Sequence, residues 1–295
     1  MWKPLDHFWT YTIWYILLGL TAVGELAAAF VLARNRRLAF GLYFILAGIV
    51  LTFETMILIF GKAYAYYPML LQTSPDPFDR VLAGNLFSQF SVAATALLVA
   101  ILDLDFRWSL LLAAAYGLIE ELFLALGIYS HNWYRTWMTV LGLLLYFQLA
   151  KTLAAFLLRS VRPVAFYGCI FFGLFPLYVV TIVWAFMVSG HLSFSTAIMS
   201  DPVNSRYVLL LALYAAPGGA ATMYLYYSRP SRLRKALAVA ALSLVYTVGV
   251  KLGLIIIPAG WFLPVTAATT AWAYLSVAFM DWLLRQARTP QRRQS

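Results

Sequence analysis

Residues 38–61, LAFGLYFILAGIVLTFETMILIFG, decide the fold class of this chain. The only charged side chain in the stretch is that of Glu54. A helix needs about 20 consecutive apolar residues to cross the hydrocarbon core of a bilayer, where no backbone polar group can go unpaired. We therefore expect residues 38–61 to cross a membrane as a helix.

Comparable apolar runs recur along the whole chain. The first one has neither the basic start nor the cleavage site of a signal peptide, so we expect it to stay in the mature protein. The sequence predicts an all-α, polytopic transmembrane helix bundle of about nine helices, in a single membrane domain that covers residues 1–295. The predicted spans are 10–33, 38–61, 81–102, 108–129, 136–157, 164–188, 207–227, 236–257 and 261–283.

Composition supports a membrane location. The chain is 63% hydrophobic and 11% charged, and its mean hydropathy is +0.82. A soluble domain carries about 25% charged residues. The 10 Trp and 19 Tyr residues suit the boundary between water and lipid. Cys169 is the only cysteine, so it forms no intramolecular disulfide and is expected to serve packing.

The basic residues predict the orientation. Of the 21 lysines and arginines, most fall in the short loops on one side of the predicted spans and in the tail 284–295. The positive-inside rule makes that side cytoplasmic, which also explains the net charge of +10 without any nucleic-acid partner. An odd number of spans then places the N-terminus outside. The long outer loops are 62–80 and 189–206.

Polar side chains gather in the outer half of this predicted bundle. An unpaired charge inside lipid costs about 2.5–3.5 kcal/mol even on insertion scales, so such groups need partners or water. They predict an outward-opening cavity with Glu54 and Glu121 as candidate catalytic or proton-carrying groups. Adjacent helical residues point about 100° apart, so only one of Glu120 and Glu121 is expected to face the cavity. The candidate substrate-binding residues are Glu54, Asn85, Gln89, Glu120, Glu121, His131 and Lys251.

Structural interpretations of the same residues stay open. Glu54 or Glu121 would pair with Lys251, and Glu25 with Lys151, to fix the packing of the helices. The aromatic residues near the outer boundary are explained as an interfacial belt more readily than as a binding surface. The three histidines are scattered, and no cofactor-binding motif is present, so no metal and no cofactor are predicted.

Two prolines near the middle of neighbouring spans predict kinks. Pro176 lies in FGLFPLYVV and Pro217 in YAAPGGAAT, where Gly218 and Gly219 weaken the helix further. In transporters such broken helices act as hinges beside a binding site. A simple kink that improves helix packing explains them as well.

Glu54 and Glu120 each precede a glycine by seven residues, Gly61 and Gly127. Both segments run outward and enter a tyrosine-rich loop, which hints at an ancient duplication.

Two segments carry a family resemblance. YAYYPMLLQTSPDPFDRVLAGNLFSQFSV and IEELFLALGIYSHNWYRTWMT resemble uncharacterised polytopic membrane proteins of spore-forming Gram-positive bacteria. The resemblance covers roughly residues 50–150 and implies the bacterial cytoplasmic membrane, but it brings no activity. The string IEELF is also similar to an acidic motif of small membrane-bound carotenoid and terpene cyclases.

These observations leave three hypotheses for function. The first is transport or sensing of a small solute or lipid through the outward-opening cavity. The second is an intramembrane enzyme that acts on an isoprenoid or lipid, with a glutamate as general acid and aromatic rings that stabilise a carbocation. The third is a structural or assembly component of the membrane, linked to sporulation. The bilayer is the one partner that every hypothesis requires, and the oligomeric state is left open.

Overall fold

The computed structural model describes residues 8–67, 77–158, 163–228 and 231–288, with side chains for all of these except 77–85 and 286–288. Within these ranges, eight helices are long and apolar enough to cross a membrane. A further helix, α4 (Pro77–Ile101), is apolar over Leu86–Ile101. The prediction of an all-α polytopic bundle is confirmed, and the helices lie close to their predicted ranges.

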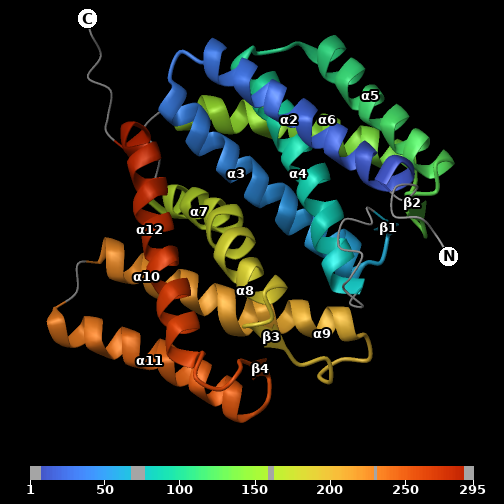
Figure 1. The fold of residues 1–295 in the computed structure, drawn as a ribbon. Coiled ribbons are helices and arrows are strands. Elements are labelled where there is room, and N and C mark those ends of the chain that lie inside the picture. The colour runs from blue at the N-terminus through green and yellow to red at the C-terminus, as the bar shows by residue number, and fades with distance from the viewer. Residues whose placement is uncertain (1–7, 68–76, 159–162, 229–230, 289–295) are drawn as a thin grey trace, which may run out of the picture. The chain divides into compact units, whose positions relative to one another are not determined.

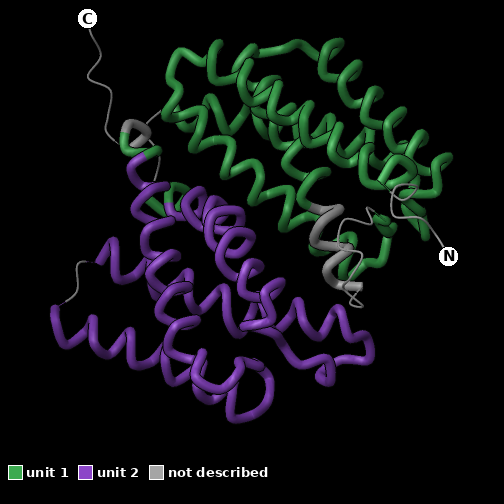
Figure 2. The backbone as a smooth tube through the Cα atoms, in the orientation of Figure 1, with its two compact units in different colours: residues 1–166, 283–295 green, residues 167–282 purple. Residues whose placement is uncertain are grey.

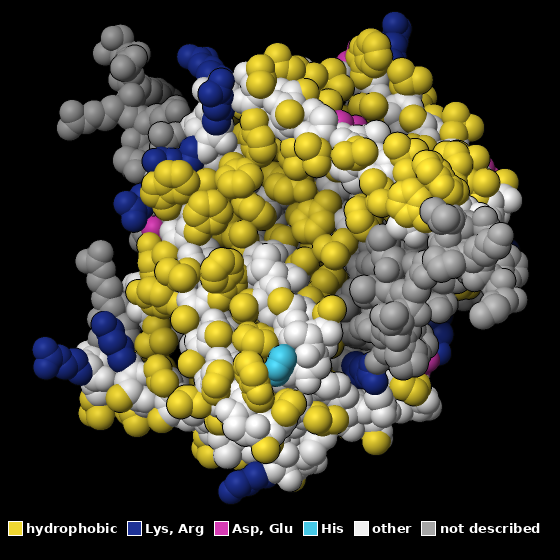
Figure 3. Space-filling view, in the orientation of Figure 1, with side chains coloured by type: hydrophobic (Ala, Val, Ile, Leu, Met, Phe, Trp, Pro, Cys, Tyr) yellow, Lys and Arg dark blue, Asp and Glu magenta, His cyan; other side chains and the backbone are white. Residues whose placement is uncertain are grey.

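Large apolar side chains are exposed on many of these helices. Leu118, Leu145 and Leu263 are 72%, 66% and 73% exposed. Figure 3 shows hydrophobic side chains over much of the visible face, with lysine and arginine side chains mostly toward its margins. Because exposed apolar surface of this extent is rare on soluble proteins, the chain is a multi-pass membrane protein that presents this surface to lipid.

The chain forms two compact units (Figure 2). Unit 1 contains residues 1–166 and 283–295, and unit 2 contains residues 167–282. The single membrane domain expected from the sequence stays a prediction.

Unit 1 contains the first five spans (Figure 1). Polar caps start two of the helices at the side predicted to be cytoplasmic. The Asn35 side chain accepts a hydrogen bond from the Leu38 N–H, and the Asp105 side chain accepts two from the following turn. In chain order the elements are η1 (Phe8–Thr12, a π-helical turn), α2 (Ile13–Leu32), α3 (Arg36–Glu54), η2 (Thr55–Phe60, π-helical), β1 (Tyr64–Tyr66), α4, α5 (Phe106–Ala125), β2 (Tyr129–His131) and α6 (Thr136–Leu157).

Helix α4 is the centre of unit 1 and packs against α2, α3 and α6. Its buried face is built from small side chains, among them Ala93, Ala94 and Ala96, each fully buried. Small residues allow close approach of helices inside a membrane, where association depends on packing and not on exclusion of water. Because α4 is central, polar side chains on it face the interior of the unit.

Unit 2 contains most of the last four spans. A cluster of buried tyrosines lies at its centre, where Tyr214 and Tyr246 stack with ring centroids 4.4 Å apart. The Tyr214 hydroxyl lies 2.8 Å from that of Thr269. The elements are α7 (Pro163–Leu174), η3 (Phe175–Val183, π-helical), α8 (Trp184–Val188), β3 (Ser193–Phe194), α9 (Pro202–Val208), η4 (Leu209–Ala215, π-helical), α10 (Ala216–Tyr227), α11 (Arg232–Lys251), β4 (Ile255–Ile256) and α12 (Phe262–Arg288).

Each unit joins two of its loops by a short antiparallel strand pair. In unit 1, β1 pairs with β2, so that Tyr66 lies opposite Tyr129. In unit 2, β3 pairs with β4, so that Phe194 lies opposite Ile255. Paired loops must lie on the same side of the membrane, in agreement with the alternating topology of the predicted spans.

The two units repeat one arrangement. Residues 36–157 and 163–288 show the same order of span, strand, two spans, strand and span. Helices α5 and α11 both have 20 residues and both lead into a glycine with positive φ, 68° at Gly127 and 67° at Gly253. The same pair of backbone hydrogen bonds closes both helix ends. This four-span repeat has an offset of 126 residues between α5 and α11. It differs from the duplication hinted at by the sequence, in which Glu54 and Glu120 correspond, because both of these residues lie in the first repeat.

Candidate functional site

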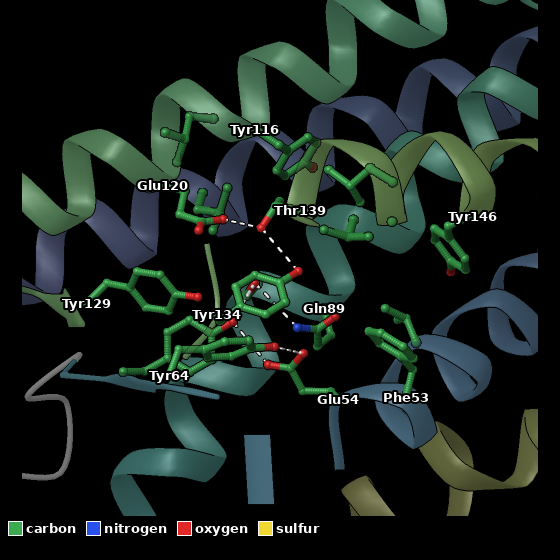
Figure 4. A pocket seen from close by; sticks show the side chains of 18 of the residues that line it. Phe53, Glu54, Tyr64, Gln89, Tyr116, Glu120, Tyr129, Tyr134, Thr139 and Tyr146 are labelled. Atoms are coloured by element: carbon green, nitrogen blue, oxygen red, sulfur yellow. Dashed lines mark hydrogen bonds between the residues drawn. The ribbon is translucent and has the colours of Figure 1, made fainter. Parts of the chain in front are cut away.

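Unit 1 contains a partly open cavity of about 400 Å³. The walls come from α2, α3, α4, α5 and α6 and from the two strands β1 and β2. Figure 4 shows its polar side chains converging on one space. The polar lining residues are Glu54, Tyr64, Tyr66, Ser88, Gln89, Tyr116, Glu120, Tyr129, Tyr134, Thr139 and Tyr146.

Glu54 ends α3 and is only 3% exposed. Its carboxyl group accepts two hydrogen bonds from strand β1, from the Tyr64 hydroxyl at 2.5 Å and from the Tyr66 hydroxyl at 3.0 Å. The π-helical turn η2 follows directly, and π-helical turns are frequent at functional sites. The strand therefore holds the carboxyl group at the end of α3.

Glu120 forms the second acidic wall, on α5. Its Oε1 lies 2.6 Å from the His131 Nε2, and its Oε2 accepts a hydrogen bond from the Thr139 hydroxyl. The Thr139 hydroxyl also lies 3.3 Å from the Tyr134 hydroxyl. The Glu120 and His131 side chains are 10% and 13% exposed. Two carboxyl groups from different helices thus face one cavity.

Aromatic rings surround the two carboxyl groups. The Tyr64 ring centroid lies 5.3 Å from that of Tyr129 and 4.9 Å from that of Tyr134, and Tyr66 and Tyr129 are 5.2 Å apart. Burial raises the pKa of Tyr64, Tyr66 and Tyr129, and the nearby Glu54 carboxylate raises all three further. These hydroxyls therefore remain protonated donors at any physiological pH.

Among the described residues, the cavity wall holds the acidic side chains Glu54 and Glu120 but no lysine, arginine or histidine. Among the side chains that the structure describes, no lysine or arginine forms an ion pair with Glu54 or Glu120. Two carboxyl groups without a described lysine or arginine partner therefore face the cavity.

The structure brings together Glu54, Gln89, Glu120 and His131 from the predicted site. Gln89 is 4% exposed and its amide donates toward the Ser88 hydroxyl at 3.5 Å. Glu120, and not its neighbour, lines the cavity. The exposed Glu121 points away by the rotation of about 100° and accepts a hydrogen bond from Thr136.

Glu121, His131 and Lys251 are not among the described residues that line the cavity. The side chain of Asn85 lies outside the described residues. Lys251 belongs to unit 2, where it is exposed at the end of α11. An alternative pair, Glu25 with Lys151, is not formed within unit 1. The Lys151 ammonium lies 2.7 Å from the Asp103 carboxylate, and Glu25 accepts a hydrogen bond from Thr95.

Sequence reasoning missed the tyrosines and threonine of the cavity wall. The interpretation as an interfacial belt applies to Tyr64, Tyr66 and Tyr134, but all three line the cavity. Tyr64 and Tyr66 also donate hydrogen bonds to Glu54. The alternation of tyrosine with alanine in KAYAYYP is the one signal for a strand that turns one face inward. Asp281 in α12, only 5% exposed and bonded by Tyr226 and Tyr227, was missed too.

The predicted hinge residues lie where helices change type. Pro176 is the second residue of the π-helical segment η3. Pro217 is the second residue of α10, which directly follows the π-helical segment η4. Proline removes a backbone donor, which disrupts the regular α-helical ladder at both places. Gly218 allows a close approach, because a Cβ there would lie 2.7 Å from the hydroxyls of Tyr178 and Tyr246. Gly219 is buried beside it.

No protein-family model, no curated protein and no solved structure matches this chain.

Proposed function

We propose that this protein is a membrane transporter whose unit 1 binds a small amphipathic molecule with a cationic amino group. The observation that carries the proposal is the pair of carboxyl groups, Glu54 and Glu120, in a tyrosine-lined cavity where no described lysine or arginine pairs with them. Carboxylates and the faces of aromatic rings both attract an ammonium group. A cavity of about 400 Å³ falls in the size range of small-molecule sites.

The remaining walls suit an apolar body attached to that amino group. Leu18, Ile49, Val92, Phe123 and Leu143 line the cavity beside the polar groups. A ligand with an apolar ring system and one amino group would place the ring against these side chains. Its ammonium group would lie between the two glutamates.

The predicted orientation places this site in the outer half of a bacterial cytoplasmic membrane. Glu54 lies six residues before the end of η2, or about 9 Å at 1.5 Å per residue. The positive-inside bias supports an outer position for this end of the helix. Three π-helical segments, η2, η3 and η4, give these spans places at which access could change between the two sides.

Uptake of 1-naphthylmethylamine into proteoliposomes tests the proposal. We expect Glu54→Gln and Glu120→Gln to reduce uptake to the rate of protein-free vesicles, with unchanged yield and elution volume of the protein. Glu121→Gln is the matched control, because this adjacent carboxyl group is exposed and bonds to Thr136 outside the cavity. Equal uptake by wild type and both cavity variants would refute the transport proposal.

A second candidate is an intramembrane enzyme acting on an isoprenoid, for which Glu120 would be the general acid. The favouring observation is the Glu120 carboxyl group, bonded to His131 and Thr139 and flanked by the tyrosine rings, which would stabilise a carbocation. Purified protein incubated with a panel of prenyl diphosphates and linear isoprenoids separates the two. Turnover that Glu120→Gln abolishes supports the enzyme, and no turnover across the panel excludes it.

A further inference from the structure

A second polar cluster connects the cavity with the opposite half of unit 1. The Tyr116 hydroxyl, whose residue lines the cavity, lies 2.8 Å from the hydroxyl of Ser91 and 2.8 Å from that of Thr95. Thr95 donates to the Glu25 carboxyl group at 2.5 Å. Ser91 and Thr95 are completely buried. Four side chains from α2, α4 and α5 thus form a continuous hydrogen-bonded chain.

This hydrogen-bonded chain of side chains reaches deeper into the predicted bilayer than the cavity does. Glu25 lies 17 residues after the start of η1 at Phe8, about 26 Å along the helix, whereas Glu54 lies about 9 Å from the outer end of η2. In the predicted orientation Glu25 is therefore in the cytoplasmic half of the bilayer. The chain leads from the cavity toward the cytoplasm.

The groups around Glu25 leave it without a basic partner. Thr95 from α4 bonds to it and Tyr116 from α5 faces it through Thr95, and no described lysine, arginine or histidine forms an ion pair with it. An intramembrane carboxyl group of this kind is a functional candidate. Glu25 can take up and release a proton without breaking an ion pair.

The repeated arrangement of the two units supports a functional role for the hydrogen-bonded side chains. Helices α5 and α11 correspond with an offset of 126 residues, so the position of Tyr116 is taken by Leu242 and that of Glu120 by Tyr246. The shared fold therefore does not require a hydroxyl at the position of Tyr116. Both Tyr116 and Glu120 are features of the unit that holds the acidic cavity.

We propose that Tyr116, Thr95 and Glu25 form a proton path that exchanges a cytoplasmic proton for each amine handled by the cavity. The path rests on the transport function proposed above. For one transfer toward the cavity, the Thr95 hydroxyl first turns its hydrogen from Glu25 to Tyr116. Protonated Glu25 then gives its proton to Thr95, Thr95 gives its own to Tyr116, and Tyr116 gives its own to ionised Glu120. Glu120 lies one helical turn beyond Tyr116 on the same helix, a gap that one water molecule can bridge. Only O–H bonds are broken and formed, and one proton moves.

Proton flux in proteoliposomes tests the path. Vesicles that contain a trapped pH-sensitive dye are given a pH difference, and the internal pH is followed with and without 1-naphthylmethylamine. We expect Tyr116→Phe and Thr95→Val to lower the amine-dependent flux at least about tenfold, the lower range for loss of a proton-transferring group. Calorimetric affinity of Thr95→Val for the amine should stay within about twofold of wild type, since Thr95 is not among the described residues that line the cavity and an acid–base effect acts on transfer and not on binding.

The control variant is Tyr214→Phe in unit 2. It removes one buried tyrosine–threonine hydrogen bond of the same length, 2.8 Å to Thr269, but no carboxyl group bonds to this pair. We expect its flux to equal that of wild type.

Three results would overturn the path: wild-type flux no faster than that of protein-free vesicles, unchanged flux in Tyr116→Phe, or a loss of amine affinity in Thr95→Val as large as its loss of flux. Failure of the transport proposal is recognised by a different result, namely that the wild-type protein does not bind the amine.

Discussion

The hydrogen bond from Tyr64 to Glu54 is the contact on which the geometry of the cavity depends most. It joins strand β1 to the end of α3 at 2.5 Å, and both side chains are buried. Tyr64→Phe removes this hydroxyl alone and keeps the ring, which packs against Tyr129 and Tyr134. The variant therefore isolates one bond to the acidic site.

The structure sets the expected magnitude. A distance of 2.5 Å lies in the range of charge-assisted O–H···O⁻ bonds, which runs from about 2.5 to 2.7 Å. Hydrogen bonds to charged groups contribute about 1.5–3 kcal/mol to stability, and neutral ones about 0.5–1.5 kcal/mol. We expect Tyr64→Phe to lower the free energy of unfolding by about 1.5–3 kcal/mol, since the Tyr66 bond to the carboxyl group remains.

Reversible denaturant unfolding in detergent micelles measures this loss. The matched control is Tyr67→Phe, which removes a 3.2 Å bond to the Ser130 hydroxyl from the same strand region and should cost about 1 kcal/mol or less. In a double-mutant cycle, Tyr64→Phe should cost less in a Glu54→Gln background, because the acceptor is then neutral. Equal losses in Tyr64→Phe and Tyr67→Phe, together with strict additivity in the cycle, would refute the reasoning.

Two further predictions follow from the fold. Gly127→Ala and Gly253→Ala should each lower the free energy of unfolding by about 1–2 kcal/mol, because both glycines have positive φ and an added Cβ would meet no atom within 4 Å, so backbone strain is the whole effect. Unchanged unfolding in either variant would contradict the shared helix end. In a Cys169→Ala background, a cysteine at Trp133 should react with a membrane-impermeant maleimide on intact cells, and a cysteine at Arg107 should react only after permeabilisation. The opposite labelling pattern would reverse the orientation.

The sequence predicts the lengths of the membrane spans and the depth of each polar residue in the bilayer. Lipid imposes a minimum length on every span, so apolar runs such as 38–61 predict helices directly. Position along a helix also gives depth, at about 1.5 Å per residue. This is why Glu54, Gln89 and Glu120, all predicted in the outer half or near the midplane, line one cavity.

The sequence does not predict which face of each helix turns inward or which helices pack together. Glu120 and Glu121 are adjacent, and only the packing of α5 against α6 determines which one faces the cavity. Lys251 was grouped with Glu54 on depth alone, and depth is one coordinate of three. The structure places Lys251 in unit 2, at the end of α11.

The tyrosine wall depends on contacts between distant parts of the chain. Tyr64 and Tyr66 turn toward Glu54 because β1 pairs with β2, about 65 residues further along the chain. A belt at the lipid boundary and a strand in a binding site share the same composition, so the sequence could not separate them. The proton path has the same origin, since Glu25, Thr95 and Tyr116 meet from three helices.

The most direct test of the cationic site compares two ligands of nearly equal shape on the purified wild-type protein. Titration calorimetry with 1-naphthylmethylamine and with 1-naphthalenemethanol at neutral pH measures what the positive charge contributes, because the ring system is the same. We predict at least about tenfold tighter binding of the amine, or about 1.4 kcal/mol. Equal or tighter binding of the neutral alcohol would contradict a cavity built for a cation.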